Sequence, residues 1–252
     1  MRPELHHLRA QVRAIEAHAR PHVTPLATGG DGLDDALGGG LAIGGITEFV
    51  PAAFMDEPAS ITFALACAAT ALAQRAGDLV IVEDGSHARL WGHIYGPGLQ
   101  ALGVDPRRVL LVSTPSSKAT HACLEDCART TGLAGVLGFV GPKAGFALAG
   151  ARRVQLAAEQ GGAVVMVVAS LRTPVFAPAF ARLKIAAAPS RGRVLRGASL
   201  PDLGPPVWHV SLERARSGAR PQTFELEYDY ATHRLYQPAS LGHRYSDAQR
   251  RA

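Results

Sequence analysis

The sequence predicts an α/β protein with a mostly parallel sheet, helices on both faces and antiparallel strands at the C-terminal end. Between residues 46 and 168, short apolar runs alternate with longer helical stretches, which is typical of parallel strands joined by helices. After Ser170, further strand patterns follow one another without a long helix between them. Strands in such a series pair antiparallel, because a parallel pair needs a crossover connection.

Length and composition fit one main core. Of the 252 residues, 47% are hydrophobic and 19% charged, which excludes disordered and fibrous classes. The formal charge of +5 permits nucleic acid or an acidic partner without requiring either. No signal peptide or membrane span is evident, and the three cysteines favour a reducing compartment over a disulfide framework. We therefore expect a soluble cytoplasmic protein that makes no membrane contact.

The N-terminal region divides into a helix and a linker. Apolar residues spaced three and four apart between Leu5 and Ala19 predict a short helix, which gives an N-terminal unit of residues 1–22. Residues 21–45 are rich in Gly, Pro and Asp and predict a flexible linker that contains Gly38–Gly40. We expect the main domain to span residues 23–238 and residues 239–252 to form a flexible tail.

The elements of the main domain follow in order. Parallel strands are predicted at residues 46–50, 79–82, 109–112, 136–140 and 163–168, and helices at residues 58–76, 98–103, 119–131 and 146–160. The later strands are predicted at residues 182–187, 207–213, 223–228 and 234–236. Residues 214–220 form a long basic hairpin loop in this prediction.

The loop after the first of these strands lies where a strand-loop-helix unit would hold phosphates. Residues 50–60 read VPAAFMDEPAS and lack the glycines, lysine and hydroxyl residue of a phosphate-binding loop. Pro51 has no amide to donate, and Asp56 and Glu57 place negative charge where a triphosphate would bind. We therefore expect no nucleotide hydrolysis in this loop.

Four stretches carry a resemblance to a known family. Residues 32–48 (GLDDALGGGLAIGGITE) resemble the beginning of the ATPase core of RecA-type recombinases, and more closely the ImuA family, the RecA-like accessory proteins of bacterial mutagenic repair cassettes. The stretches similar to ImuA then continue in order: YGPGLQALGVDPRRVLLV at 95–112, RRVQLAAEQG at 152–161, and WHVSLERARSG with FELEYD at 208–218 and 224–229. The resemblance covers most of residues 30–236 and implies a RecA-like core.

The chain departs from an active RecA at its nucleotide site. Aligned without gaps, Pro51 stands at the first P-loop glycine, Asp56 at the second, Glu57 at the lysine and Pro58 at the hydroxyl residue. The strand at residues 135–140 carries no acidic residue for Mg²⁺. We therefore expect no catalytic residue, no metal site and no cofactor, with ATP bound only if a partner completes the site.

Three groups of residues have more than one interpretation. Glu83 and Asp84 end a strand near the place where RecA-type ATPases carry a water-activating carboxylate, but we favour a solvated loop. Nearby His87 suggests hydrolase chemistry, although the chain has no G-x-S-x-G motif. Basic residues in two loops are candidate contacts for a partner or DNA, or are solvated surface. They are Arg214 and Arg216, in the hairpin loop, and Arg191, Arg193 and Arg196, where RecA-type proteins carry DNA-binding loops.

The resemblance to ImuA implies a non-catalytic accessory protein of damage-induced (SOS) translesion synthesis and mutagenesis. It would bridge an ImuB-like protein, itself a degenerate relative of Y-family polymerases, and an error-prone polymerase III alpha-type subunit. RecA and DNA are further candidate partners, and the protein would join the nucleoid when engaged. Two alternatives stay open. One is a RecA-like ATP-dependent DNA-binding protein with a rearranged phosphate site, and the other is a RecA inhibitor without polymerase contacts.

Overall fold

A computed structural model describes residues 24–141, 148–171, 179–190, 192 and 203–238. The predicted N-terminal helix, the tail at residues 239–252 and the candidate residues Arg191, Arg193 and Arg196 lie outside the described residues.

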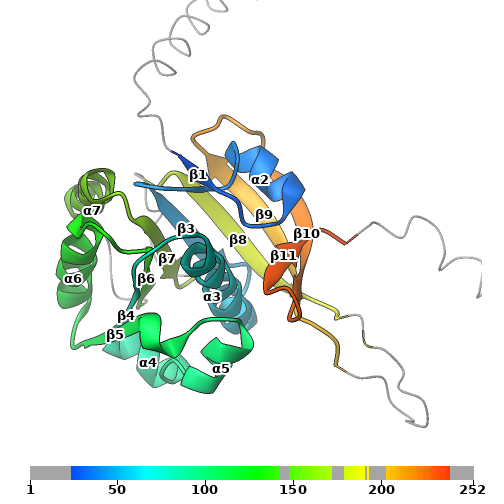
Figure 1. Cartoon of the computed structure of the whole chain (residues 1–252), viewed down its shortest axis with the longest axis horizontal. Helices are drawn as coiled ribbons and strands as arrows, with labels where there is room; N and C mark the ends of the chain where they lie inside the picture. The colour runs from blue at the N-terminus through cyan, green and yellow to red at the C-terminus, as the bar shows by residue number, and fades with distance from the viewer. Residues whose placement is uncertain (1–23, 142–147, 172–178, 191, 193–202, 239–252) are drawn as a thin grey trace, which may run out of the picture.

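Nine strands form one sheet, most of it parallel. The parallel strands are β3 (Ile46–Pro51), β4 (Leu79–Asp84), β5 (Val109–Thr114), β6 (Gly135–Val140), β7 (Val164–Ala169) and β8 (Ala181–Ala188). They lie in the order β8-β3-β7-β6-β4-β5, with β3 between β7 and β8 (Figure 1). Strands β4, β6 and β7 are largely apolar runs buried on both faces, whereas β8 alternates apolar residues with Arg182 and Lys184.

The prediction of antiparallel pairing for all strands after Ser170 is wrong for β8, which pairs parallel with β3. The other three C-terminal strands extend this sheet antiparallel, as predicted. They are β9 (Val207–Ala215), β10 (Gln222–Asp229) and β11 (Arg234–Tyr236), which continue outward from β8. One face of this part is apolar, because Trp208, Leu226 and Tyr228 are all buried. The other face carries polar cross-strand neighbours such as Ser211 and Thr223, whose hydroxyls lie 2.8 Å apart.

Helices cover both faces of the parallel part, which confirms the predicted fold class. Helix α3 (Glu57–Gln74) packs against β3, β6, β7 and β8. On the other face, α6 (Ser117–Arg129) packs against β4, β5 and β6, with α7 (Leu148–Gly161) beside it (Figure 1). Two buried cores result, one on each face of the sheet. No helix in the described ranges is long and apolar enough to cross a bilayer.

Helix α3 has no wide polar stripe, because it is enclosed between the sheet and other elements. Its residues 63–72 are all buried and rich in alanine, whose small side chain lets the helix lie close to the strands. Phe63 meets the rings of Phe49 and Trp208 edge-on, with centroid separations of 5.9 Å and 5.4 Å. The helix thereby joins the parallel and antiparallel parts of the sheet.

The prediction of a flexible linker at residues 21–45 is wrong for the described part, residues 24–45. This part contains α2 (Asp31–Leu37) and a two-stranded sheet of β1 (Pro25–Leu26) and β2 (Leu41–Ala42). Leu33 and Leu37 are buried in the core. The Asp34 carboxylate accepts hydrogen bonds from the N–H and hydroxyl of Thr28 and the N–H of Gly29, at 2.8–3.0 Å. The glycines of residues 24–45 therefore lie in tight turns of a packed segment.

The predicted basic hairpin loop at residues 214–220 begins later in the structure. Strand β9 continues to Ala215, so Arg214 is a strand residue that pairs opposite Arg182. The turn that follows is held in place, because the Arg216 N–H donates to the Phe180 carbonyl at 2.8 Å and the Ser217 hydroxyl to the Ala36 carbonyl at 2.7 Å. The hairpin therefore packs against α2 and the residue before β8.

Helix α4 (Gly85–Trp91) is absent from the sequence prediction. It begins directly after β4, where the Asp84 carboxylate caps it by accepting from the Ser86 N–H at 2.7 Å. A second short helix, α5 (Gly96–Ala101), follows close to its predicted position. These two helices bring Trp91 and its neighbours beside the beginning of α3, where Trp91 contacts Glu57.

Candidate functional site

The candidate site lies at the carboxyl end of β3, where the chain turns into α3 through the short helix η1 (Phe54–Asp56). The Ala52 N–H donates to the Ile185 carbonyl at 2.8 Å, and the Ala53 N–H donates to the Asp56 carboxylate at 3.0 Å. The other oxygen of Asp56 accepts from the Ala187 N–H at 3.0 Å. This turn is therefore bonded to itself and to β8.

These hydrogen bonds already use backbone N–H groups that a bound phosphate would need. A phosphate-binding loop aims several free backbone N–H groups at one anion, often with residues at positive φ. Here the N–H groups of Ala52 and Ala53 already donate to protein oxygens, and Pro51 and Pro58 have none. None of residues 51–58 has a positive φ. The residues present do not fit a nucleotide triphosphate.

Glu57, which the sequence prediction aligns with the P-loop lysine, is the first residue of α3, and its side chain is buried. One of its carboxylate oxygens accepts a hydrogen bond from the indole N–H of Trp91 at the end of α4. The Trp91 ring also contacts the ring of Phe54, with 5.3 Å between centroids. Glu57 thus joins the turn after β3 to helix α4.

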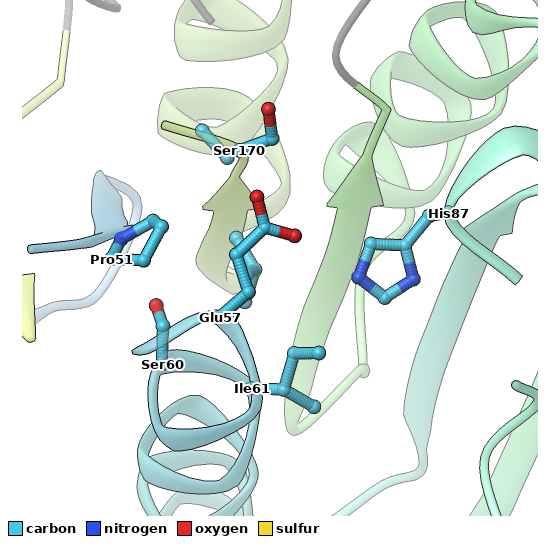
Figure 2. A pocket seen from close by; sticks show the side chains of 8 residues that line it. Pro51, Glu57, Ser60, Ile61, His87 and Ser170 are labelled. Atoms are coloured by element: carbon cyan, nitrogen blue, oxygen red, sulfur yellow. The ribbon is translucent and has the colours of Figure 1, made fainter. Parts of the chain in front are cut away.

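A small pocket lies beside Glu57 (Figure 2). It is lined by Pro51, Glu57, Ser60, Ile61, His87, Val168, Ala169 and Ser170. Its lining atoms leave no room for a water-sized sphere, whereas small-molecule sites usually occupy ~300–1,000 Å³. The pocket is therefore too small for a nucleotide.

His87 forms one side of this pocket. Its ring stacks on Phe139, with 4.9 Å between centroids. Burial lowers the pKa of His87 to about 4, although the charges of Glu83 and Asp84 oppose that effect. The ring is therefore neutral at pH 7. Its Nδ1 atom and the Ser60 hydroxyl are buried without a hydrogen-bond partner among the described residues.

Glu83 is not in a solvated loop, contrary to our expectation, because it is a buried residue of β4. One of its carboxylate oxygens accepts from the Ile94 N–H at 2.8 Å, and the other lies 3.0 Å from Nδ1 of His93. Both partners lie between α4 and α5. Both carboxylate oxygens of Glu83 are thus engaged in holding the connection between these helices.

Asp84 is buried as well, and its carboxylate is surrounded by donors. It accepts from the hydroxyls of Ser86 at 2.5 Å, Ser117 at 2.8 Å and Thr120 at 3.3 Å. Burial alone would raise the pKa of Asp84, but these hydrogen bonds together outweigh burial and lower the pKa. Asp84 therefore joins β4 and α4 to α6 as an ionised structural group.

A charged cluster that the sequence prediction missed joins β3, β8 and β9. The buried carboxylate of Glu48 lies 2.6 Å from Nη1 of Arg182, whose Nε lies 2.9 Å from the carboxylate of Glu213. Lys184 also contacts Glu213. Glu213 occupies the irregular position where the β8–β9 register shifts. The only signal in the sequence is the alternation of apolar and basic residues along β8.

The structure brings some candidate residues together and separates others. The carboxyl edge of the parallel strands holds four of them close together in the chain, namely Pro51, Asp56, Glu57 and Pro58. Arg214 and Arg216 lie beside the beginning of β8, at the opposite edge. Sequence reasoning missed Ser60 and Trp91 as site residues. Trp91 is 34 residues from Glu57, so no local pattern signals their contact.

The amino-acid sequence is similar to those of two curated relatives. It is 31% identical over 234 residues to Protein ImuA of Caulobacter vibrioides (strain NA1000 / CB15N), covering 87% of this chain and 89% of the relative. Protein ImuA of Caulobacter vibrioides (strain ATCC 19089 / CIP 103742 / CB 15) gives the same identity and coverage. No protein-family model matches the chain. The similarity extends over most of both proteins, and the chain belongs to the ImuA family.

Proposed function

We propose that this chain is a non-catalytic accessory protein of the ImuA/ImuB mutagenesis cassette, which acts in damage-induced translesion DNA synthesis. Membership of the ImuA family supports the biological setting. The observation that carries the non-catalytic part is the turn after β3, where Asp56 and the strand β8 occupy the backbone donors and Glu57 replaces the lysine.

Electrostatics supports the same proposal. A nucleotide triphosphate at this turn would face the Glu57 carboxylate in place of a lysine ammonium, and like charges close together in a protein repel by several kcal/mol. The neighbouring carboxylates Glu83 and Asp84 add negative charge at the same edge of the sheet. Hydrolysis also requires groups that hold Mg²⁺ and orient water, and Glu83 and Asp84 are already bonded to other residues.

The first partners in this proposal are proteins. An ImuB-like protein is the first, an error-prone polymerase III alpha-type subunit the second, and RecA and DNA are further candidates. Exposed apolar side chains near the turn offer a surface for such contacts, because Phe54, Met55 and Leu90 expose 54%, 81% and 56% of their area. Single exposed apolar side chains are common on protein surfaces, whereas several close together are typical of interaction sites.

The alternative of an ATP-dependent DNA-binding protein requires a second phosphate site. The remaining glycine-rich stretch, Gly38 to Gly45, follows α2 and leads into β2 and β3, so it does not point at the beginning of a helix. This observation favours the adaptor. A RecA inhibitor without polymerase contacts shares the same structure and differs only in the choice of partner.

Calorimetric titration of the purified chain with the ImuB-like protein of the same organism tests the proposal. We expect saturable binding with a stoichiometry near one, and a stable complex on gel filtration. The same titration with RecA separates the adaptor from the inhibitor. Binding to RecA together with no binding to the ImuB-like protein would replace the adaptor with the inhibitor, and binding to neither would overturn both.

A further inference from the structure

Strand β5 is the outermost strand of the parallel part of the sheet, and its side chains are unusually exposed. In the part of the chain that the structure describes, β5 pairs only with β4 (Figure 1). All six residues of β4 and of β6 are buried, whereas Leu110 and Leu111 of β5 expose 58% and 41% of their area. Adjacent exposed leucines at a sheet edge are typical of a surface that another chain covers.

The backbone of β5 also has hydrogen-bonding groups to offer. The N–H and C=O groups of a strand point alternately to its two sides, so half of those in β5 point away from β4. No backbone hydrogen bond joins residues 110–113 to a described residue outside β4. A row of such groups is matched by a second extended backbone, so the ligand that fits this edge is another β-strand.

The two leucines lie on opposite faces of the sheet. Val109 packs against the core on the α3 side, and Val112 packs against the core on the α6 side. Because side chains alternate along a strand, Leu111 shares the face of Val109 and Leu110 shares the face of Val112. A strand that covers both leucines must therefore carry apolar side chains on both of its own faces. Strand β5 itself, which reads VLLV at residues 109–112, meets this requirement.

The charges around β5 permit two copies to approach each other. Residues 109–114 include no charged side chain and no proline, and their register with β4 is continuous, so the features that usually protect a sheet edge are absent from β5. Arg108, just before the strand, donates to backbone carbonyls at the end of α3. Arg107 pairs with Asp105, with 2.9 Å between nitrogen and oxygen. A second copy therefore meets no electrostatic repulsion along the strand.

We propose that β5 pairs antiparallel with β5 of a second copy of this chain, which joins the two sheets across a two-fold axis. An antiparallel pair of identical strands is self-complementary, and closed two-fold dimers are the commonest oligomers of soluble proteins. Each copy then covers Leu110 and Leu111 of the other. Strands β7, β6 and β4 separate β5 from β3, so the turn after β3 stays accessible in each copy. The inference goes beyond the proposed function and does not depend on it.

The mass of the full chain in solution tests the dimer. Sedimentation over a range of concentrations should give twice the mass of one chain, with dissociation on dilution. Replacing Leu110 and Leu111 together by lysine should weaken association about 100-fold or more, because four ammonium groups would meet near the two-fold axis. Both leucines are exposed in the single chain, so this variant should fold with an unchanged thermal midpoint. Leu156→Lys is the matched control, because Leu156 is 42% exposed on α7, away from the sheet edge; it should leave the mass unchanged.

Disulfide trapping tests the pairing itself. In a two-fold antiparallel pair, one residue lies opposite its own copy with about 4.5–5.5 Å between Cβ atoms, and a small shift brings such a pair to disulfide distance. Either Leu110→Cys or Leu111→Cys should therefore trap a covalent dimer under mild oxidation, in a chain whose Cys123 and Cys127 are replaced by serine. Leu156→Cys in the same background should not.

Three results would overturn the inference. They are a wild-type chain that stays monomeric at every soluble concentration, a dimer that the paired lysines leave intact, and a dimer that neither new cysteine traps. If the wild-type chain is monomeric and the paired lysines abolish binding of the ImuB-like protein, the edge receives a strand of that partner. In that case the second copy is overturned and the proposed function stands.

Discussion

The carboxylate of Asp56 accepts a hydrogen bond from the backbone N–H of Ala187, 131 residues later in the chain. Its second oxygen accepts from Ala53, so one side chain closes the turn after β3 and fastens it to β8. The ungapped sequence reading predicts a P-loop glycine of RecA-type ATPases at this position. In this chain the Asp56 side chain instead attaches the turn to β8.

Replacement of Asp56 by alanine should lower the free energy of unfolding by about 1–2 kcal/mol, because two backbone N–H groups lose their acceptor near solvent. Urea denaturation measures the loss. Asp35→Ala is the control, since Asp35 is exposed and should change stability by no more than about 0.5 kcal/mol. Equal effects of the two substitutions would show that the Asp56 bonds contribute nothing.

Gly40→Ala should be strongly destabilising. Gly40 has a φ of +126°, and an added Cβ would lie 2.1 Å from the Leu26 carbonyl oxygen. We expect a loss of about 3 kcal/mol or more, against about 1–2 kcal/mol for Gly92→Ala, where φ is +82° and nothing lies within 4 Å. Denaturant midpoints compare the two variants. A Gly40→Ala chain as stable as wild type would mean that this segment is the flexible linker that composition predicts.

Glu83→Ala should loosen the connection between α4 and α5. The Ile94 N–H loses its acceptor, and the expected cost is about 1–3 kcal/mol. Hydrogen exchange should become faster in residues 92–95. Glu83→Gln keeps an acceptor for Ile94 and should retain most of the protection. Unchanged exchange in the alanine variant would contradict the role given to Glu83.

Stability should fall on acidification between about pH 6.5 and 4. Burial lowers the pKa of His87 from 6.5 to about 4. Within this window the unfolded chain binds a proton at His87 that the folded chain does not bind, so acid favours the unfolded chain. The full displacement corresponds to about 3 kcal/mol. His87→Phe keeps the stacking on Phe139 and should remove most of this dependence. His121, whose pKa burial also lowers, supplies the remainder.

A variant chain with the same slope of unfolding free energy against pH as wild type would contradict the assignment to His87. Burial would raise the pKa values of Asp84 and Glu213, but hydrogen bonds and ion pairs together lower them below 3.8 and 4.5, so their stabilisation begins to fall near the acid end of this window. Wild type and the His87→Phe chain share both groups, so their contribution cancels when the two slopes are compared.

Most of the parallel core was predictable, because strands such as β6 and β7 are continuous apolar runs between longer helices, whereas the mixed pattern of β8 did not predict its parallel pairing with β3. Strands β4 and β6 and helix α3 lie within a few residues of their predicted positions. Helix α2 was not predictable, because seven residues are too few to show a helical repeat. Its burial depends on Phe224 and Leu226, about 190 residues later, which pack against Gly30 and Gly32.

The candidate site was predictable only in part. The substitutions at Pro51, Asp56, Glu57 and Pro58 are legible in the sequence, because a phosphate loop has fixed chemical requirements. The burial of Glu83 and Asp84 was not, since their acceptor oxygens meet donors up to 36 residues away. Carboxylates after an apolar run suggest a solvated loop until those distant partners are known.

In the proposed function, the turn after β3 binds no phosphate and the chain acts through protein partners. Calorimetric titration with ATP and Mg²⁺, on the chain alone and on its complex with the ImuB-like protein, tests this most directly. We predict no saturable heat in either titration, since the donors of the turn are occupied and Glu57 repels the phosphates. Saturable binding with a stoichiometry near one by the chain alone would contradict the claim, and saturable binding by the complex alone would mean that the partner completes a nucleotide site.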